Sequence, residues 1–135
     1  MVSLAPELLA VGHVTRDIHP DGSFTIGGTV TFAALVAHYL GLVAGVVTCA
    51  DAELREALPA YLPNVALHTR PSEQTTTFTN LYQGGFRIQY LHAHGAPLQL
   101  TDVPQDWLAA PIVLFAPIAQ ELDHTFVTKL SLSSP

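Results

Sequence analysis

Apolar positions along this chain change their period from segment to segment, and each period predicts an element. A continuous apolar run at 8–11 is typical of a strand that is covered on both faces. From Thr29 onward the apolar positions recur at helical spacing, and Gly41 suits the position just after the end of that helix. A strand at 42–48 then completes a β-α-β order. The expected buried face of the helix consists of Val30, Ala33, Ala34, Ala37 and Leu40.

The same alternation continues through the rest of the chain. Asp51 precedes a short helical pattern and can cap it, with Leu54 and Leu58 on the buried face. The remaining expectations are strands at 65–68 and 112–115, a loop at 97–111, and no defined element in the tail from His124.

Two segments have the period-two pattern of β-hairpins. The first joins 14–19 to 23–26 through Pro-Asp-Gly, a sequence that favours a tight turn. The second joins 75–82 to 86–92 through Gln-Gly-Gly, with Phe86, Ile88, Tyr90 and His92 on one face. Strands that alternate with helices predict an α/β fold with a mostly parallel sheet. The hairpins do not fit that layer, so we expect them to form a separate small antiparallel sheet.

Composition limits the class of protein. The 135 residues fit a single domain, with the hairpin segments at about 14–27 and 75–95. Only 12% of residues are charged and 49% are hydrophobic, so we expect either that much of the chain is buried or that some apolar surface faces a partner or a missing part of the same protein. The net charge of −6 argues against nucleic-acid and membrane partners. A start without positive charge and a single cysteine make the cytoplasm the default location.

Candidate binding chemistry lies just after the first strand. Asp17 follows that strand, and Gly27 and Gly28 open the helix. Open α/β sheets bind ligands at the carboxyl ends of their strands. A carboxylate accepts hydrogen bonds from a diol and glycines allow close approach to backbone amides, so the pattern favours a neutral polyhydroxy compound. Two plainer interpretations stay open: Asp17 serving only a turn, and the diglycine serving only helix–strand packing.

These residues resemble the amino-terminal half of the PfkB, or ribokinase-like, carbohydrate kinase family. The resemblance covers about 8–121 and rests on Val-Gly-x-x-x-x-Asp at 11–17, the diglycine at 27–28, Val-Val-Thr-Cys at 46–49 and Thr-Thr-Thr-Phe at 75–78. It implies a partial doubly wound α/β domain. A small lid built from the two hairpins would cover the substrate and often form the dimer contact.

The resemblance also implies site residues. Asp17, Gly27 and Gly28 would hold substrate hydroxyls. A weaker similarity to the inositol kinase branch would add Glu121 as a second hydroxyl ligand. Phe32 stands where ribokinase-type members have a sugar-binding asparagine, which argues against ordinary ribose recognition. The lid residues expected near the substrate are Thr77, Phe78, Asn80, Tyr82, Arg87 and Tyr90.

The implied reaction transfers the γ-phosphoryl group of ATP, with Mg²⁺, to a hydroxyl of a sugar, polyol or nucleoside. The family's Gly-Ala-Gly-Asp motif, which supplies the catalytic base and an anion hole, does not occur in these 135 residues, and neither does a P-loop. We therefore expect the substrate-binding and lid half of a kinase, inactive alone and without tight ATP or Mg²⁺ binding. Its expected partners are the substrate and either a second copy through the lid or a complementing second half.

Other interpretations remain. A non-catalytic carbohydrate-binding or dimerisation module is the main alternative. A zinc site is a third, because His92 and His94 lie at period two and Glu121 and His124 could share a helical face. Cys49 follows a buried strand without a basic neighbour, which predicts an inert core thiol. An uncovered edge of a parallel sheet predicts self-association or poor solubility.

Overall fold

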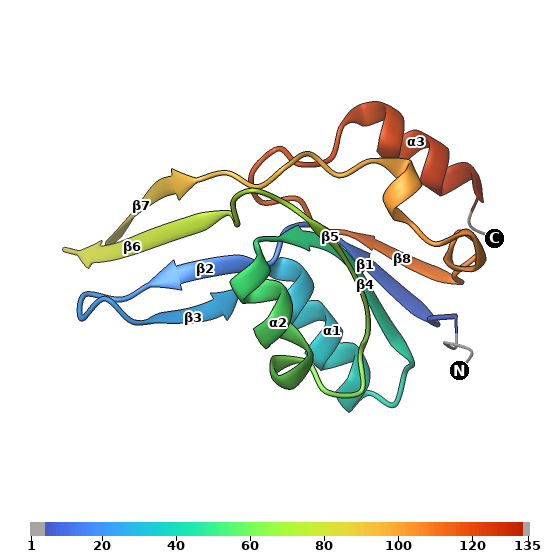
Figure 1. The fold of residues 1–135 in the computed structure, drawn as a ribbon, viewed down its shortest axis with the longest axis horizontal. Helices are drawn as coiled ribbons and strands as arrows, with labels where there is room; N and C mark the ends of the chain where they lie inside the picture. Colours follow the sequence, from blue (N-terminus) through green and yellow to red (C-terminus); the bar gives the residue numbers. More distant parts are fainter. Residues whose placement is uncertain (1–4, 134–135) are drawn as a thin grey trace.

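The computed structural model describes residues 5–133, which form two β-sheets joined at one end of the molecule (Figure 1). Sheet A is parallel, with the order β5-β4-β1-β8. Its strands are β1 (Leu8–Val11), β4 (Ala44–Ala50), β5 (Ala66–Pro71) and β8 (Ile112–Phe115). The second sheet, called the lid sheet below, has the order β3-β2-β6-β7. Its strands are β2 (Thr15–Ile18), β3 (Phe24–Gly27), β6 (Thr77–Gln83) and β7 (Phe86–Ala93).

The expected α/β class, with a parallel main sheet and a small sheet made of two hairpins, is confirmed. The lid sheet is mixed, however, rather than antiparallel. Each hairpin is antiparallel within itself, but β2 pairs with β6 in parallel, with Asp17 opposite Phe78. The reason is topological: β2 follows β1 and β6 follows β5, so both strands leave the same end of a parallel sheet and run in the same direction.

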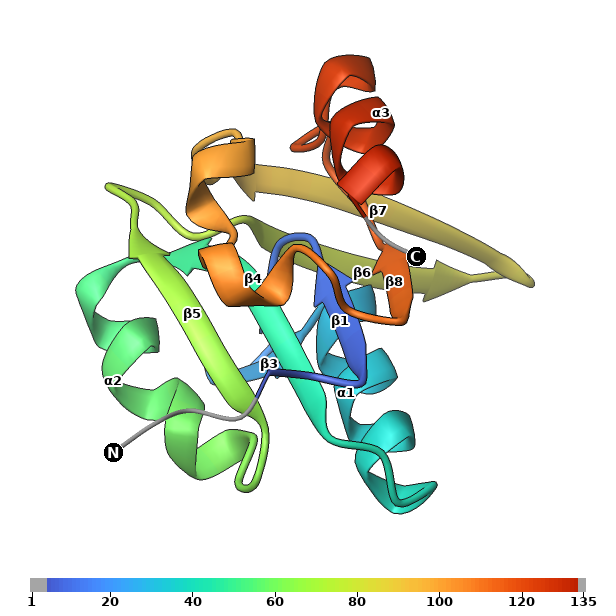
Figure 2. The ribbon, with the colours of Figure 1, turned by 90° about the vertical axis from the view of Figure 1, so that its right-hand side faces the viewer.

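Helices cover both faces of sheet A (Figure 2). On one face α1 (Thr29–Tyr39) and α2 (Ala52–Tyr61) bury Val30, Ala34, Leu54 and Leu58 against Ala10 and Val46. On the other face lie α3 (His124–Ser133) and two short 3₁₀ turns, η1 (Leu100–Asp102) and η2 (Gln105–Trp107). Trp107, Phe126 and Leu130 pack there against Leu9, Val11 and Val47. No helix within 5–133 combines the length and the hydropathy needed to cross a bilayer.

Two of the three α-helices that the structure describes begin just after an aspartate that caps them, but only one of these two was predicted from the sequence. Asp51 caps α2 as expected, because its Oδ1 accepts a hydrogen bond from the Leu54 amide at 3.0 Å. The tail after His124 is a helix, which the sequence reading missed. Asp123 caps it by accepting from the Phe126 amide at 2.7 Å. The expected loop at 97–111 likewise contains η1 and η2.

One side of the main layer is uncovered, and we call it the α1–β8 flank. Leu40, expected in the core, lies past the last turn of α1 and is 73% exposed. With Phe32 and Val36 it forms an i, i+4, i+8 stripe that is exposed. Leu114 of β8 lies beside this stripe, and together they line an apolar groove of about 350 Å³. Among the described residues, β8 pairs only with β1, so its outer edge has no neighbouring strand.

Candidate functional site

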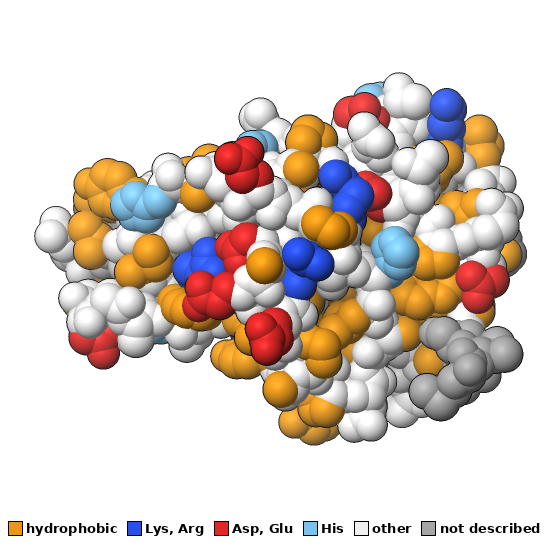
Figure 3. Space-filling view, viewed as in Figure 1, with side chains coloured by type: hydrophobic (Ala, Val, Ile, Leu, Met, Phe, Trp, Pro, Cys, Tyr) orange, Lys and Arg blue, Asp and Glu red, His pale blue; other side chains and the backbone are white. Residues whose placement is uncertain are grey.

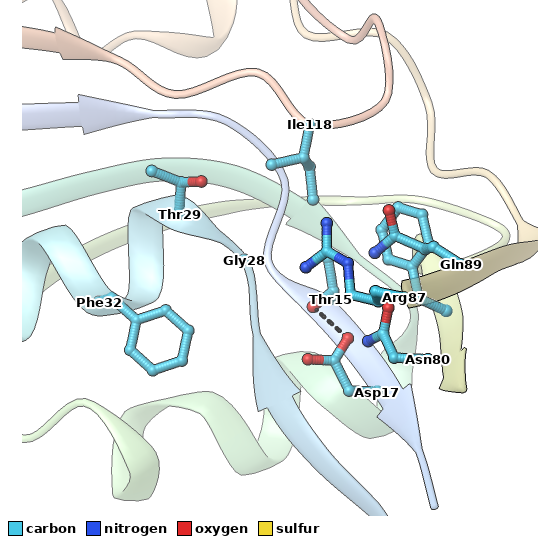
Figure 4. Close-up of a pocket in the computed structure, with 10 residues that line it drawn as sticks. Thr15, Asp17, Gly28, Thr29, Phe32, Asn80, Arg87, Gln89 and Ile118 are labelled. Atoms are coloured by element: carbon cyan, nitrogen blue, oxygen red, sulfur yellow. Dashed lines mark hydrogen bonds between the residues drawn. The ribbon is translucent and has the colours of Figure 1, made fainter. Parts of the chain in front are cut away.

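A pocket of about 330 Å³ lies between the lid sheet and the start of α1 (Figure 4). Its volume is in the range of sites that bind small molecules, about 300–1,000 Å³. Five of the sequence-predicted residues line it: Asp17, Gly28, Phe78, Asn80 and Arg87. The other lining residues are Thr15, Thr29, Phe32, Gln89 and Ile118.

Asp17 lies in β2 and faces the pocket, half-buried. One carboxylate oxygen, Oδ1, accepts a hydrogen bond from the Thr15 hydroxyl at 2.8 Å. No donor among the residues described here bonds to the other oxygen, Oδ2. The carboxylate is therefore held by one hydrogen bond and has an oxygen available to accept from a ligand hydroxyl.

The diglycine makes room for this carboxylate. A Cβ at Gly27 would run into the carboxylate of Asp17 and lie 2.9 Å from the Thr15 hydroxyl oxygen. Gly28 has a φ of 94°, and a Cβ there would run into the carbonyl oxygen of His13. No side chain caps α1, so its first amides open toward the pocket at Gly28 and Thr29. Packing and access to the pocket thus both require the two glycines, although only Gly28 lines it.

The lid contributes the opposite wall. Asn80 of β6 pairs with Gln89 of β7, so their side chains lie on the same face of the lid sheet. Arg87 lies two residues before Gln89 and shares that face. We call this the inner face of the lid sheet; it also carries Asp17. Figure 4 shows the Arg87 guanidinium extending from β7 toward Thr15 and Gly28.

Three expected lid residues lie outside the pocket. Thr77 is buried, and its hydroxyl donates to the Thr75 carbonyl at 2.8 Å. Tyr82 is on the inner face but near the hairpin tip, where it is 74% exposed. Tyr90 points to the other face and stacks on His92, with ring centroids 6.4 Å apart.

Four residues that line the pocket were not predicted from the sequence, and three of them lie within two positions of a predicted residue. Thr15 lies two residues before Asp17, and Gln89 lies two residues after Arg87, so the period of a strand places each on the face of a predicted neighbour. Thr29 follows the diglycine directly. Ile118 comes from the loop after β8, which no local pattern brings to the pocket.

The structure does not bring Glu121 to the pocket. Its side chain is buried, with Oε1 accepting from the Ile118 and Ala119 amides at 2.9 Å each and Oε2 accepting from the His13 amide at 2.7 Å. Burial raises the pKa of this carboxyl, but the hydrogen bonds outweigh burial and hold the pKa below its ordinary value. Glu121 therefore anchors the loop that presents Ile118, and its oxygens are already engaged.

A buried histidine fastens the lid sheet to sheet A. The Nε2 of His13 lies 2.7 Å from the Ala96 carbonyl oxygen, so Nε2 donates and Nδ1 accepts from the Thr76 hydroxyl at 2.7 Å. That hydroxyl oxygen accepts in turn from the Gly95 amide at 2.9 Å. Burial lowers the pKa of His13, more than the Ala96 bond and nearby Glu121 raise it. Neutral His13 thus joins the segments before β6 and after β7.

An ion pair fastens the lid at a second point. Arg16 of β2 donates to both oxygens of Asp51, at 2.9 and 3.3 Å, and the Thr75 hydroxyl donates to Oδ2 at 2.6 Å. Burial raises the pKa of Asp51, but these bonds and the Leu54 amide outweigh burial and hold the pKa at about 2. The start of the lid is therefore fixed relative to sheet A at both hairpins.

The described residues do not support the zinc interpretation. In the part of the chain that the structure describes, no group of three or more His, Cys, Asp or Glu side chains could hold a metal ion. The Nε2 of His92 lies 2.7 Å from the Thr79 hydroxyl, and His94 contacts the Ala119 carbonyl. Cys49 lies buried within β4, opposite Arg70 of β5, so the expectation of no basic neighbour was wrong. Burial raises the pKa of its thiol by more than Arg70 lowers it, which still fits an inert core cysteine.

The other side of the lid sheet, its outer face, is mainly apolar. Register places Ile88 opposite Leu81 and Tyr90 opposite Thr79, and Ile18 pairs with Phe24 on the same side. Ile88 is 42% and Tyr90 48% exposed. In Figure 3 hydrophobic side chains gather over the ends of β6 and β7, at the left of the view. Exposed apolar patches of this kind are candidates for contact surfaces.

Comparison with known proteins places the fold. No protein-family model matches the sequence, and no curated protein matches it. Among solved structures, a pyrophosphate-dependent kinase in the ribokinase family, complexed with a pyrophosphate analog and myo-inositol, has a TM-score of 0.72 and 22% identity over 94% of this chain. The Arabidopsis thaliana ribokinase complexed with ribose and ATP has a TM-score of 0.64 and 16% identity over 96% of this chain.

A third similar structure is phosphofructokinase-2 from Escherichia coli in complex with fructose-6-phosphate, with a TM-score of 0.53 and 16% identity over 93% of this chain. The chain spans only part of these structures, covering 46%, 50% and 50% of their lengths. It therefore has a ribokinase-like fold, as the resemblance predicted, over about half the length of these kinases.

Proposed function

We propose that this chain is the acceptor-binding and lid half of a ribokinase-like carbohydrate kinase. The complete enzyme transfers the γ-phosphoryl group of ATP to a hydroxyl of a sugar, polyol or nucleoside. The observation that carries the proposal is the pocket in which the free oxygen of Asp17 and the bare backbone of Gly28 face the lid. The sugars and the polyol bound in the similar structures support the substrate class.

Within this proposal, the described residues hold the acceptor and not the phosphoryl donor. The candidate acceptor ligand is Asp17, which accepts a hydrogen bond from a substrate hydroxyl and so orients it. The sequence contains neither a P-loop nor a Gly-Ala-Gly-Asp motif that would hold the phosphates of ATP. We assign the donor site to a complementing half and expect no phosphoryl transfer by this chain alone.

The uncovered α1–β8 flank supports the proposal that a complementing half packs against this chain. Its apolar stripe of Phe32, Val36 and Leu40 and the open edge of β8 lie side by side. Parallel sheets in α/β proteins are covered on both faces and extended by strand–helix units. A further strand beside β8, with its helix against the stripe, would cover both features at once.

A second candidate is a non-catalytic carbohydrate-binding or dimerisation module. The apolar outer face of the lid sheet favours it, because an exposed surface with Ile88 and Tyr90 fits a second copy of the same sheet. A homodimer through the lid is compatible with either candidate.

Asp17→Asn tests the proposed function. Calorimetry on the full chain uses myo-inositol, ribose and fructose 6-phosphate as probes. We expect Asp17→Asn to weaken binding about tenfold or more, since a hydrogen bond to a charged group contributes about 1.5–3 kcal/mol. Asp106→Asn, at an exposed position in η2, is the matched control and should bind as the wild type does. Equal binding by Asp17→Asn contradicts the acceptor site, and ATP-dependent turnover by this chain alone contradicts the half-enzyme.

A further inference from the structure

The two walls of the pocket differ in what they offer a ligand. Asp17 offers a carboxylate oxygen, which accepts hydrogen bonds. The lid wall offers Arg87, Gln89 and Asn80, whose guanidinium and amide groups supply as many as nine N–H donors between them, about five from the arginine and two from each amide. The two amides also carry one acceptor oxygen each, and Oδ1 of Asn80 is buried without a hydrogen-bond partner among the described residues. A ligand that fills the pocket therefore meets an acceptor on one side and a surplus of donors, one of them cationic, on the other.

Arg87 forms no ion pair with any residue of the described range 5–133. The arginine ion pairs among residues 5–133 join Arg16 to Asp51 and Glu53, and Arg70 to Asp102. Asp17 is the other charged residue that lines the pocket, yet it forms no ion pair with Arg87 within 4.0 Å and is held by the Thr15 hydroxyl instead. The guanidinium of this solvent-exposed residue thus reaches into a ligand-sized space without forming an ion pair (Figure 4).

Removing water from the Arg87 guanidinium without giving it an anionic partner is unfavourable. This cost favours an anionic ligand over a neutral one. A bound ligand displaces water from the guanidinium, and that loss is offset best by an oxyanion that accepts two parallel N–H bonds. A neutral polyol satisfies Asp17 but leaves Arg87 with weak acceptors. A ligand with hydroxyls at one end and an oxyanion at the other satisfies both walls.

We propose that the acceptor substrate carries an anionic group, a carboxylate or a phosphate ester, which Arg87 binds with the amide of Gln89. Asp17 and the Gly28 backbone hold hydroxyls at the other end of the molecule. This replaces the neutral polyhydroxy ligand expected from the sequence with an anionic one, and it rests on the proposed acceptor site.

Matched probe pairs test the charge directly. Fructose and fructose 6-phosphate, and glucose and glucuronate, differ chiefly in the anionic group, and their dissociation constants for the full chain are measured by calorimetry. We expect the anionic member of at least one pair to bind about tenfold tighter, with a preference that weakens as salt rises. A phosphate-only or carboxylate-only preference identifies which oxyanion the site takes.

Arg87→Gln should abolish that preference, so that the neutral and the anionic member of each pair bind with similar affinity. Lys129→Gln, which removes the same charge on α3, should keep the preference. Equal affinity for both members of each pair, together with loss of binding in Asp17→Asn, overturns the anionic subsite and leaves the proposed function standing. Absence of binding by every probe overturns the proposed function, and this inference with it.

Discussion

The inner and outer faces of the lid sheet are made by alternate residues of the same strands, yet they differ in chemistry. Along β7, Arg87 and Gln89 line the pocket, whereas Ile88 and Tyr90 lie exposed on the other side. The inner face carries the charged and amide groups of the pocket beside Phe78, whereas the outer face presents mainly apolar side chains beside Thr79 and His92. Because strand side chains alternate, one hairpin can carry a ligand site and a contact surface that are separated by a single residue step.

The difference shows how the faces are maintained. The inner face needs space, which the diglycine provides, and a fixed position, which the bonds of His13 and Asp51 provide. The outer face depends only on the pairing register of the strands, which places its apolar side chains on one side. These side chains make few contacts within this chain. We therefore expect the inner face to be sensitive to small backbone changes and the outer face to charge.

Gly28→Ala should have the largest effect. We expect it to lower the free energy of unfolding by about 3 kcal/mol, about 1–2 kcal/mol of this from the positive φ and the rest from the contact of the new Cβ with the His13 carbonyl. Gly22→Ala is the matched control, because Gly22 has a φ of 86° but no atom within 4 Å of the added Cβ. Urea denaturation measures both. Equal losses would show that strain alone matters and that the close approach does not.

Ile88→Lys should disrupt self-association through the outer face. In a two-fold contact each substitution occurs twice, so we expect the dimer dissociation constant to rise at least about tenfold in sedimentation equilibrium. Gln89→Lys places the same charge one residue further, on the inner face, and should leave the dimer intact. If neither variant changes the association and Val36→Lys does, the contact lies on the α1–β8 flank instead.

Local sequence patterns predicted much of this fold because each strand, helix or turn depends mainly on residues that are close together in the sequence. The apolar run at Leu8–Val11, the helical spacing from Thr29 and the Gln-Gly-Gly turn each determine one element. The parallel pairing of β2 with β6 was missed because it joins strands about sixty residues apart and depends on how sheet A orients both.

The candidate site was predictable to the extent that it lies on strands. Asp17, Asn80 and Arg87 could be placed, and period two extends them to Thr15 and Gln89. The position of Glu121 could not, because one of its three backbone donors, the His13 amide, lies 108 residues away in the sequence and only the tertiary fold brings it to this loop. The same holds for Ile118, which enters the pocket on the loop that Glu121 anchors.

His13 makes the attachment of the lid sheet sensitive to acid. Its pKa in the folded protein lies below the ordinary 6.5, so the unfolded chain binds the proton first as the pH falls. The free energy of unfolding should therefore fall between pH 7 and 5, by at most about 1.4 kcal/mol per pH unit for one proton. His13→Gln should flatten this part of the profile.

The profile contains its own control at lower pH. Glu121 has a lowered pKa, so its contribution to stability is present above about 4.5 and is lost as the pH falls further. His13→Gln should keep that second decline. A profile that is unchanged between pH 7 and 5 would show that His13 does not remain neutral in the fold.

Tyr82→Ala should have the smallest effect, and it tests how far the inner face acts as a site. Tyr82 lies opposite Arg87 but is 74% exposed and outside the pocket, so we expect a change in the free energy of unfolding within about 0.5 kcal/mol and less than about a twofold change in ligand affinity. Asn80→Ala, two residues earlier and lining the pocket, should weaken binding by more. If Tyr82→Ala weakens binding as strongly, the lid must bend until its tip reaches the ligand, and the inner face would then act along its whole length.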